Sequence, residues 1–362
     1  MKKILFLILA VCMALPLAAC GNSVSQDSSS PPAGNSNSNA GSNASSNAGS
    51  AATTYSMKIA MTSTSMIFAS DIADVINAAT NGRVTVEVID SASLGSAADA
   101  VNMLRAGSLD LLMLPAAQAP GEFPVSDIVQ VPFYAPTPYV AQDVMYALLE
   151  AGLLEEYFDE MVPLAFAITD EQMLAFKNNV VISSLSELKG MKIRAVSGIT
   201  TNLVEDIMGA SVVTMGMNDV YLSLSTGIID AALSSPNQIV SNSLYDVISS
   251  LMDYPCFYGV LFIVANERLW NSLPSDIREQ IQSACNTKRD QIREYYDSEG
   301  DNSRKTIMEN NVNIYTPGQD LVNDLVTNGQ ILQKVFEDKL NDLGFDGAAV
   351  LAVANDVIAK AG

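Results

Sequence analysis

Arg194 is the residue whose type and position most clearly indicate chemistry in this chain. It stands in residues 188–236, whose pattern predicts the order strand, helix, strand, helix, strand, and it comes at the end of the first of these strands. Ligands of open α/β sheets bind outside the carboxyl ends of the strands. A guanidinium is a rigid, two-pronged donor that matches a carboxylate. The position therefore favours an anion contact, and a surface or interdomain salt bridge is the alternative.

The sequence lacks the residues and motifs that several kinds of catalysis and nucleotide binding need. The 362 residues contain no histidine, which removes Ser-His-Asp and Cys-His arrangements, imidazole zinc sites and the commonest general base. No G-x-S-x-G elbow, P-loop or G-x-G-x-x-G fingerprint is present. Forty acidic residues leave a hydrolase with paired carboxylates possible in principle, but no local motif singles out such a pair. We expect a protein that is not an enzyme.

The elements that would position Arg194 alternate along the chain. We expect Ser96 to cap one helix, with Asp99 in its first turn. The expected strands are residues 55–62, 84–89, 109–114, an extended stretch 163–176 with a break near Asp170, a central strand 260–265 and a late strand 313–315; the expected helices are 67–80, one from Ser96 to Gly107, two within 139–161, a long charged helix 274–310 interrupted at Gly300, and further helices to the end. Strands and helices that alternate with short connections predict parallel βαβ units.

The amino terminus predicts export. Lys2 and Lys3 precede an apolar run at residues 4–17 that is too short to span a bilayer comfortably. Residues 17–20, LAAC, resemble the lipobox of bacterial lipoproteins, which implies a signal peptide at residues 1–19 and a lipid on Cys20. The alternative is an ordinary secretory signal with a chance cysteine. The remainder of residues 20–54 is almost entirely Ser, Asn, Gly and Ala, a composition typical of a flexible tether.

The remaining 308 or so residues are too many for one comfortable core, so two domains are expected. The formal charge is −21, or −23 once the two lysines of the signal are removed. Such an acidic protein is a poor partner for nucleic acid or for an anionic membrane surface. Cys256 and Cys285 remain in the exported part, and whether they pair is left open because a domain of this size does not need a disulfide.

Three motifs in this region resemble one known family. KGMKIRAV, GASVVTMGMNDVY and GIIDAALSSP, within residues 189–236, resemble the solute-binding subunits of tripartite ATP-independent periplasmic (TRAP) transporters, and the likeness extends over about residues 55–292. The resemblance implies an α/β, two-lobed, type II periplasmic-binding-protein fold, with two α/β domains joined by crossover strands and a long C-terminal helix. The lobes are expected to be residues 55–170 plus 256–285, and 171–255 plus 286–362.

The resemblance also implies roles for individual residues. Arg194 matches the arginine that holds the ligand carboxylate in this family. The other candidates for ligand contact are Met217, where the family usually has an aromatic residue, Ser235, where it often has an asparagine, its neighbour Ser234, Gln172 near the position of a second arginine, and Ser63 and Thr64 after the first strand. Ordinary core packing of Met217 and an interdomain position for Gln172 are the alternatives.

The chain departs from the family pattern in ways that concern the ligand. Val213 replaces a proline, Asp219 replaces a glutamate, and the second arginine is not evident. One cationic anchor favours a monocarboxylate, or an acid with a sizeable apolar body, over a C4-dicarboxylate. The acidic run at residues 297–301 lacks the spacing of an EF-hand and is expected to be a solvated helix face. No metal and no cofactor are expected.

The sequence thus predicts an extracytoplasmic receptor, anchored by lipid to the cell membrane and monomeric. Its expected partners are a small organic acid, which it would capture by lobe closure, and the membrane permease of a TRAP transporter. A lipoprotein that senses the same kind of ligand for a signalling receptor is the alternative, and the sequence does not separate the two.

Overall fold

The computed structural model describes residues 53–62, 67–90, 93–119, 121–154, 158–196 and 198–361. These belong to a compact unit that begins at Ala52. Cys20, Ser63 and Thr64 lie outside the described residues.

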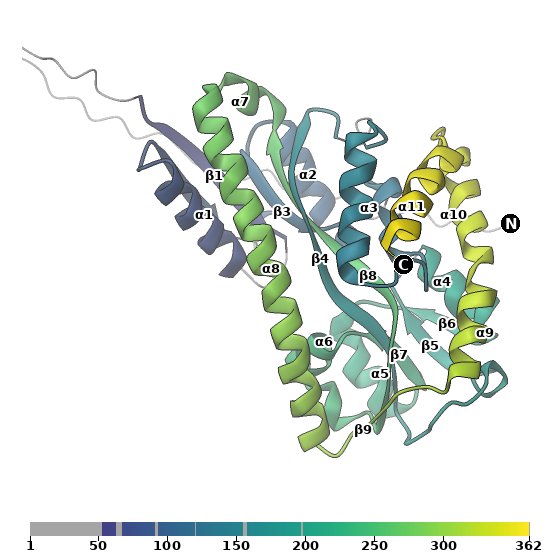
Figure 1. Cartoon of the computed structure of the whole chain (residues 1–362). Coiled ribbons are helices and arrows are strands. Elements are labelled where there is room, and N and C mark those ends of the chain that lie inside the picture. Colours follow the sequence, from purple (N-terminus) through teal and green to yellow (C-terminus); the bar gives the residue numbers. More distant parts are fainter. Residues whose placement is uncertain are drawn as a thin grey trace, which may run out of the picture. The chain divides into compact units, whose positions relative to one another are not determined.

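One mixed sheet forms the centre of this unit (Figure 1). Its strands are β1 (Tyr55–Met61), β2 (Val84–Ile89), β3 (Leu111–Pro115), β4 (Met161–Phe176), β5 (Lys192–Ala195), β6 (Ser211–Thr214), β7 (Ala231–Ser234), β8 (Ser250–Asn266) and β9 (Asn313–Tyr315). Their order in the sheet is β2-β1-β3-β8-β4-β7-β5-β6, and β9 pairs with β8. The pairs β1/β2, β1/β3, β5/β6 and β5/β7 are parallel, as the alternation of strands and helices predicts.

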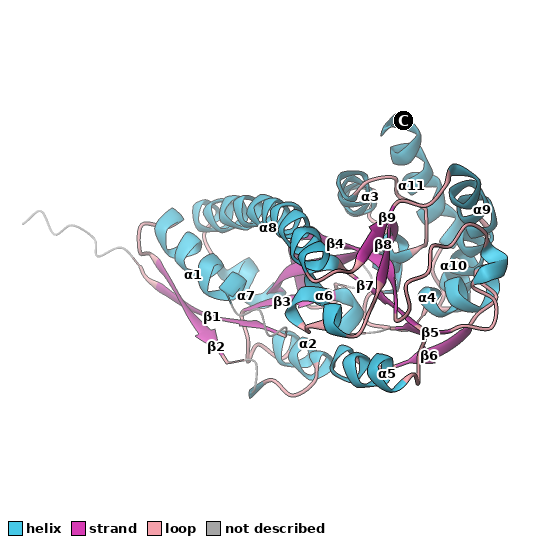
Figure 2. Cartoon of the chain, turned by 90° about the horizontal axis from the view of Figure 1, so that it is seen from below, coloured by secondary structure: helices cyan, strands magenta, loops and turns pink. Residues whose placement is uncertain are grey.

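Helices lie on both faces of the sheet (Figure 2). They are α1 (Ile67–Ala79), α2 (Ala97–Arg105), α3 (Pro138–Glu150), α4 (Ile199–Asn202), α5 (Val220–Thr226), α6 (Pro236–Ser241), α7 (Glu267–Ser272), α8 (Ser275–Glu309), α9 (Gln319–Gly329), α10 (Ile331–Asp342) and α11 (Gly347–Ala361), with shorter turns η2 (Ala116–Gln118), η3 (Pro124–Gln130), η5 (Leu185–Glu187), η6 (Leu203–Ile207), η7 (Met217–Asp219) and η8 (Leu244–Asp246). Of the helices in the described part of the chain, none has both the length and the apolar character needed to cross a membrane.

Two long antiparallel strands, β4 and β8, join the two parallel halves of the sheet. β8 pairs with β3 of the first half, and β4 pairs with β7 of the second. The register of β4 on β8 shifts between Ile168 and Glu171, where the sequence predicts a break near Asp170. Such a bulge bends a strand and redirects its side chains.

The 35-residue helix α8 spans both halves. It packs against α1 of the first half, α6 of the second and the crossing strand β4. Arg304 of α8 fixes this arrangement because its Nη2 binds Glu171 of β4 at 2.5 Å while its Nε binds Asp253 of β8 at 3.0 Å. One guanidinium therefore ties the long helix to both crossing strands.

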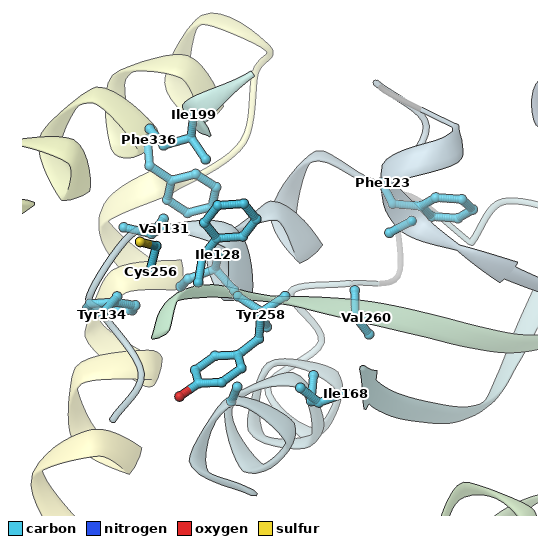
Figure 3. Packing of buried hydrophobic residues seen from close by; sticks show 14 of the residues in the cluster. Phe123, Ile128, Val131, Tyr134, Ile168, Ile199, Cys256, Tyr258, Val260 and Phe336 are labelled. Atoms are coloured by element: carbon cyan, nitrogen blue, oxygen red, sulfur yellow. The ribbon is translucent and has the colours of Figure 1, made fainter. Parts of the chain in front are cut away.

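The core follows from the alternation of side chains along the strands. One apolar cluster fills the face of β1, β3 and β8 under α1 and α8, and a second lies between β4, β7, α5 and α6. The largest cluster covers the opposite face and includes residues of both halves, among them Ile128, Tyr258 and Phe336 (Figure 3). The C-terminal helices take part in it, since α11 packs on α3 and α10 contacts α4.

Most of the expected elements are present, and two expectations are wrong. The capping box of α2 is formed by Ser96 and Asp99, and β9 has the expected bounds. Gly300, however, lies within an unbroken α8, because a buried glycine in the middle of a long packed helix can be tolerated when tertiary contacts hold the helix. Within residues 139–161 the described part contains one helix, α3, which ends at Glu150 before a turn at Gly152 with a φ of 71°.

Cys256 and Cys285 are buried free thiols. They belong to different apolar clusters, on different faces of the sheet. Burial raises the pKa of each thiol to about 12, so both stay protonated near neutral pH.

We predict that Arg304→Met destabilises the fold by about 1–3 kcal/mol, because Glu171 and Asp253 then lose a charged partner they share. Urea unfolding monitored by circular dichroism measures the effect. Lys334→Met is the control, since Lys334 forms only pairs within α10 with an exposed side chain and its loss is expected to leave the midpoint unchanged. Equal midpoints for the Arg304 variant and the wild type would contradict this role of Arg304.

Candidate functional site

The candidate site lies where three parallel strands end. β5 pairs with β6 on one side and β7 on the other, all in the same direction, so their carboxyl ends meet at one edge of the sheet. Arg194 is the penultimate residue of β5 and lies opposite Val213 of β6 and Ala232 of β7. The sequence prediction that Arg194 comes at a strand end in the second half of the sheet is confirmed to within one residue.

The guanidinium of Arg194 is held by backbone carbonyls at this edge. Its Nε donates to the carbonyl of Met215 at 3.1 Å, and its Nη1 donates to the carbonyl of Leu233 at 2.8 Å. These bonds fix the plane of the group. Nη2 donates to none of the described residues.

Arg194 is a buried charge that has no acidic partner among the described residues. Only 4% of the residue is exposed, and none of the ion pairs within the described ranges includes it. Burial lowers its pKa to about 10, so it is still cationic at neutral pH. A buried unpaired charge is costly, and proteins usually retain one where a ligand or partner supplies the opposite charge. The arrangement can therefore bind an anion.

Ser234 and Ser235 end β7 and begin α6, and both are fully buried. The hydroxyl of Ser235 accepts from the backbone N–H of Gln238 at 3.2 Å, and the Gln238 side chain returns to the Ser235 backbone. This capping box satisfies the first turn of α6. Ser234 donates to the side chain of Gln238 at 3.4 Å. The sequence places both serines at the same strand edge as Arg194, and the structure also gives Ser235 a structural task.

Two further candidates lie near this edge and are half-buried. Met217 begins η7, close to the carbonyl of Met215 that binds Arg194, and packs against the apolar cluster of the second half. Gln172 lies on the crossing strand β4, opposite Phe257. Their roles as ligand contacts stay predictions, as does that of Ser235.

Asp170 is a candidate site residue that the sequence analysis missed. It lies on β4 beside the bulge and is 7% exposed. Its Oδ2 is buried and has no hydrogen-bond partner among the described residues, and Nδ2 of Asn237 on α6 is in the same state. Burial raises the pKa of Asp170 to about 6, although nearby Ser235 and Asn237 lower it. One signal was available, because Asp170 interrupts a strand that is otherwise strongly apolar on its amino-terminal side.

Another buried arginine, Arg293 of α8, differs from Arg194 in having an acidic partner, although its Nε and Nη1 bond to none of the described residues. It forms an ion pair with Asp297 one turn later, and its guanidinium lies 4.7 Å from the centre of the Tyr139 ring. Asp297 also accepts a hydrogen bond of 2.8 Å from the Tyr139 hydroxyl. The first carboxylate of the acidic run at residues 297–301 therefore makes contacts within the fold.

Two hollows of about 330 Å³ each lie away from Arg194. One is beside the segment that leads to α9, and the other is next to β4 and β5 in the second half of the sheet. One is lined by residues 181–183 and 316–321, the other by residues that include Asn178, Lys189 and Asp230. Neither includes Arg194 or Asp170, and neither gathers buried polar groups of the kind found at the strand edge.

Comparison with known proteins places the chain among binding proteins. The model of the family described as bacterial extracellular solute-binding protein, family 7, matches residues 55–339. A solute-binding protein of Chromohalobacter salexigens is 24% identical over 254 residues, 68% of this chain and 72% of the other. The C4-dicarboxylate-binding periplasmic protein DctP of Rhodobacter capsulatus is 24% identical over 212 residues, 57% of this chain and 62% of the relative, so that alignment spans less than two thirds of its length.

Solved structures share the fold. The Bordetella pertussis extracytoplasmic solute receptor DctP7, which binds pyroglutamic acid, superposes with a TM-score of 0.70 at 22% identity, covering 83% of this chain and 99% of the other. A marine metagenome TRAP solute-binding protein in complex with 3-hydroxybenzoate gives a TM-score of 0.74 at 21% identity, covering 85% and 99%. The expected two-lobed α/β binding-protein fold is confirmed by this likeness.

The raised pKa of Asp170 predicts a pH effect on stability. The folded-state pKa of about 6 exceeds the unfolded value near 4, so the protonated carboxyl favours the folded state. This contribution to the stability of the wild type is lost as the pH rises from about 4 through 6. The stability of Asp170→Asn relative to the wild type should therefore increase by on the order of 3 kcal/mol from pH 4 to pH 7. Urea unfolding at a series of pH values measures this difference.

Asp99→Asn is the control of opposite sign. Hydrogen bonds from Ser96 lower the pKa of Asp99, so the contribution of this carboxylate to stability is present above pH 4 and lost as the pH falls through its folded-state pKa. Parallel pH profiles for Asp170→Asn and the wild type would show that the Asp170 carboxyl is not desolvated in the fold.

Proposed function

This chain belongs to family 7 of the bacterial extracellular solute-binding proteins, and from that premise we propose that it captures a small monocarboxylate with Arg194 and delivers it to a TRAP permease. Members of this family bind solutes outside the cytoplasm and work with membrane subunits. The proposal concerns the kind of ligand, the residue that holds it and the way the protein is held at the membrane.

The observation that carries the proposal is the unpaired guanidinium of Arg194. Its position is fixed by two carbonyls, at 3.1 and 2.8 Å, while no carboxylate of the described residues neutralises it. A ligand carboxylate would supply the missing charge in a site from which water is largely excluded, where charge-assisted hydrogen bonds are strong. Truncation of one partner of a buried charge pair costs about 2–5 kcal/mol.

The solutes of related proteins are acids, which supports this ligand class. The receptor from Bordetella pertussis binds pyroglutamic acid, the marine protein was solved with 3-hydroxybenzoate, and the relative from Rhodobacter capsulatus binds C4-dicarboxylates. We favour a monocarboxylate because Arg293, another buried arginine, already has Asp297 as its partner. A second free cation for a second carboxylate is absent from the edge where Arg194 lies, as far as the described residues extend.

Capture would proceed by closure of the two lobes about the crossing strands. We take the lobes to be residues 55–170 plus 256–285, and 171–255 plus 286–362. β4, β8 and α8 are the segments that pass from one half to the other, and the bulge near Asp170 offers a bend in one of them. Closure removes water from around Arg194 and so strengthens its hold on an anion.

The mature protein is proposed to be a monomer held at the outer side of the membrane by a lipid on Cys20. Residues 20–54 would then serve as the tether between the lipid and the binding unit. Two or more acyl chains suffice for a durable anchor.

Arg194→Ala should remove at least about two thirds of the stabilisation given by an acid that the wild type binds. Native mass spectrometry of the purified full chain would first identify a co-purified acid. At 100 times its dissociation constant, this acid should stabilise the wild type by about 2.7 kcal/mol. The variant should bind it roughly thirty- to several-thousand-fold more weakly.

Arg83→Ala is the matched control, since it removes one positive charge from a partly exposed pair with Asp276 in the first half of the sheet. It should keep the full melting-temperature shift. A shift of equal size in Arg194→Ala, folded by circular dichroism, would remove Arg194 from the binding site.

Replacement of Cys20 should release the protein from the membrane. In cells fed a labelled fatty acid, the wild type should carry the label and sediment with membranes, whereas Cys20→Ala should lose both properties because no thiol is left to acylate. Cys12→Ala is the control, as Cys12 lies within the expected signal peptide. A labelled Cys20 variant would contradict the anchor.

A further inference from the structure

Asp170 is buried, and one of its carboxylate oxygens has no hydrogen-bond donor among the described residues. The packing of the fold does not require an acidic residue at this position. Asp170 is 93% buried by its exposed fraction of 7%, and Oδ2 accepts no hydrogen bond from the described residues. None of the ion pairs in the described part of the chain includes it, whereas its neighbour Glu171 is paired with Arg304. The side chains of Ser235 and Asn237 favour its ionised form in part. A buried carboxylate without a cationic partner is still costly, so a further donor is expected to pair with Oδ2.

The surroundings of Asp170 come from both halves of the sheet and from α8. Asn237 of α6 approaches it with an Nδ2 that is also buried and unpartnered, while its Oδ1 accepts from Ser303 of α8 at 2.7 Å. Burial raises the pKa values of Tyr295 and Tyr296 of α8, and the nearby charge of Asp170 adds to the rise in both, after that of Glu299 in the case of Tyr295. The ring of Tyr295 meets that of Phe68, from α1, edge to face at 5.1 Å.

The unpaired carboxyl and the unpaired guanidinium belong to the same strand edge. Nη1 of Arg194 binds the carbonyl of Leu233, and Ser235, which is two residues further along, is a polar neighbour of Asp170. Two residues of a strand span about 6–7 Å. Within the described ranges, the β7–α6 junction thus has Arg194 without an acidic partner on one side and Asp170 without a cationic partner on the other.

We propose that the Asp170 carboxylate accepts a hydrogen bond from the acid that Arg194 holds, so that the ligand is a carboxylate bearing an ammonium or hydroxyl group. This inference rests on the proposed function. A ligand with such a donor satisfies Oδ2 of Asp170, whereas a plain acid leaves it buried and unpaired. Sites built to bond a polar group of the ligand reject analogues that lack it far more strongly than apolar pockets reject a missing methylene.

The test compares acids that differ only in the donor. For each of three carbon skeletons, the unsubstituted acid, the 2-hydroxy acid and the 2-amino acid are titrated into the full chain by calorimetry: propanoate, lactate and alanine; 4-methylpentanoate, 2-hydroxy-4-methylpentanoate and leucine; 3-phenylpropanoate, phenyllactate and phenylalanine. In the skeleton that binds best, the donor-bearing acid should bind at least about tenfold more tightly than the unsubstituted acid.

Two substitutions at Asp170 separate the two donors. Asp170→Leu removes both acceptor oxygens and should erase the preference for either donor while the affinity for the unsubstituted acid is kept. Asp170→Asn keeps one neutral acceptor, so a preference for the hydroxy acid should largely survive and a preference for the amino acid should be lost. Asp246→Asn, which removes an exposed acid of η8, is the control and should retain the wild-type preferences.

The outcomes that overturn the inference differ from those that overturn the proposed function. Equal affinities within each matched set, or a preference unchanged in Asp170→Leu, would mean that Asp170 and Asn237 satisfy one another, and the inference fails. The proposed function survives that result as long as Arg194→Ala abolishes binding of the acids. If neither the co-purified acid nor any acid in the panel binds in a way that depends on Arg194, both fail.

Discussion

The burial of the Arg194 charge, with no counter-charge in the part of the chain that the structure describes, is the constraint on which the account of the site depends. Backbone carbonyls of Met215 and Leu233 hold the guanidinium in place, but carbonyl dipoles do not neutralise a full charge. The sheet creates this position because three short parallel strands end at one edge, where the carbonyls of Met215, just beyond β6, and of Leu233, near the end of β7, converge on the side chain. A stable fold gains nothing from such a charge, since an apolar residue would pack there at lower cost.

The segments around this edge include a rigid part, β8 and α8, and a strand with an irregular register, β4, where a bend can occur. β4 and β8 are the long strands that link the two parallel halves, and α8 lies along them with Arg304 bound to both. The irregular register of β4 falls next to Asp170, at the passage between the halves. The same short stretch therefore bends β4 and holds the buried Asp170 carboxyl close to α6. A change in the bend of β4 would move this carboxyl relative to the other polar groups of the candidate site.

Local signals in the sequence were sufficient for most elements but not for every contact. The βαβ alternation, the capping box of α2 and the strand end at Arg194 follow from patterns within a few residues, and the structure contains them. The break expected at Gly300 is absent, because packing of α8 on α1, β4 and α6 outweighs the low helix propensity of one glycine. Asp170 and Asn237 were missed because their unmet bonds depend on β4, α6 and α8 meeting in space, which no local pattern encodes.

The central claim is that the guanidinium of Arg194 binds the carboxylate of an acidic solute. A crystal structure of the full chain purified with its acid tests this most directly. The account predicts a carboxylate oxygen within hydrogen-bond distance of the Arg194 guanidinium, at the edge where β5, β6 and β7 end. An acid bound elsewhere, with Arg194 neutralised by a carboxylate of the protein itself, would contradict it.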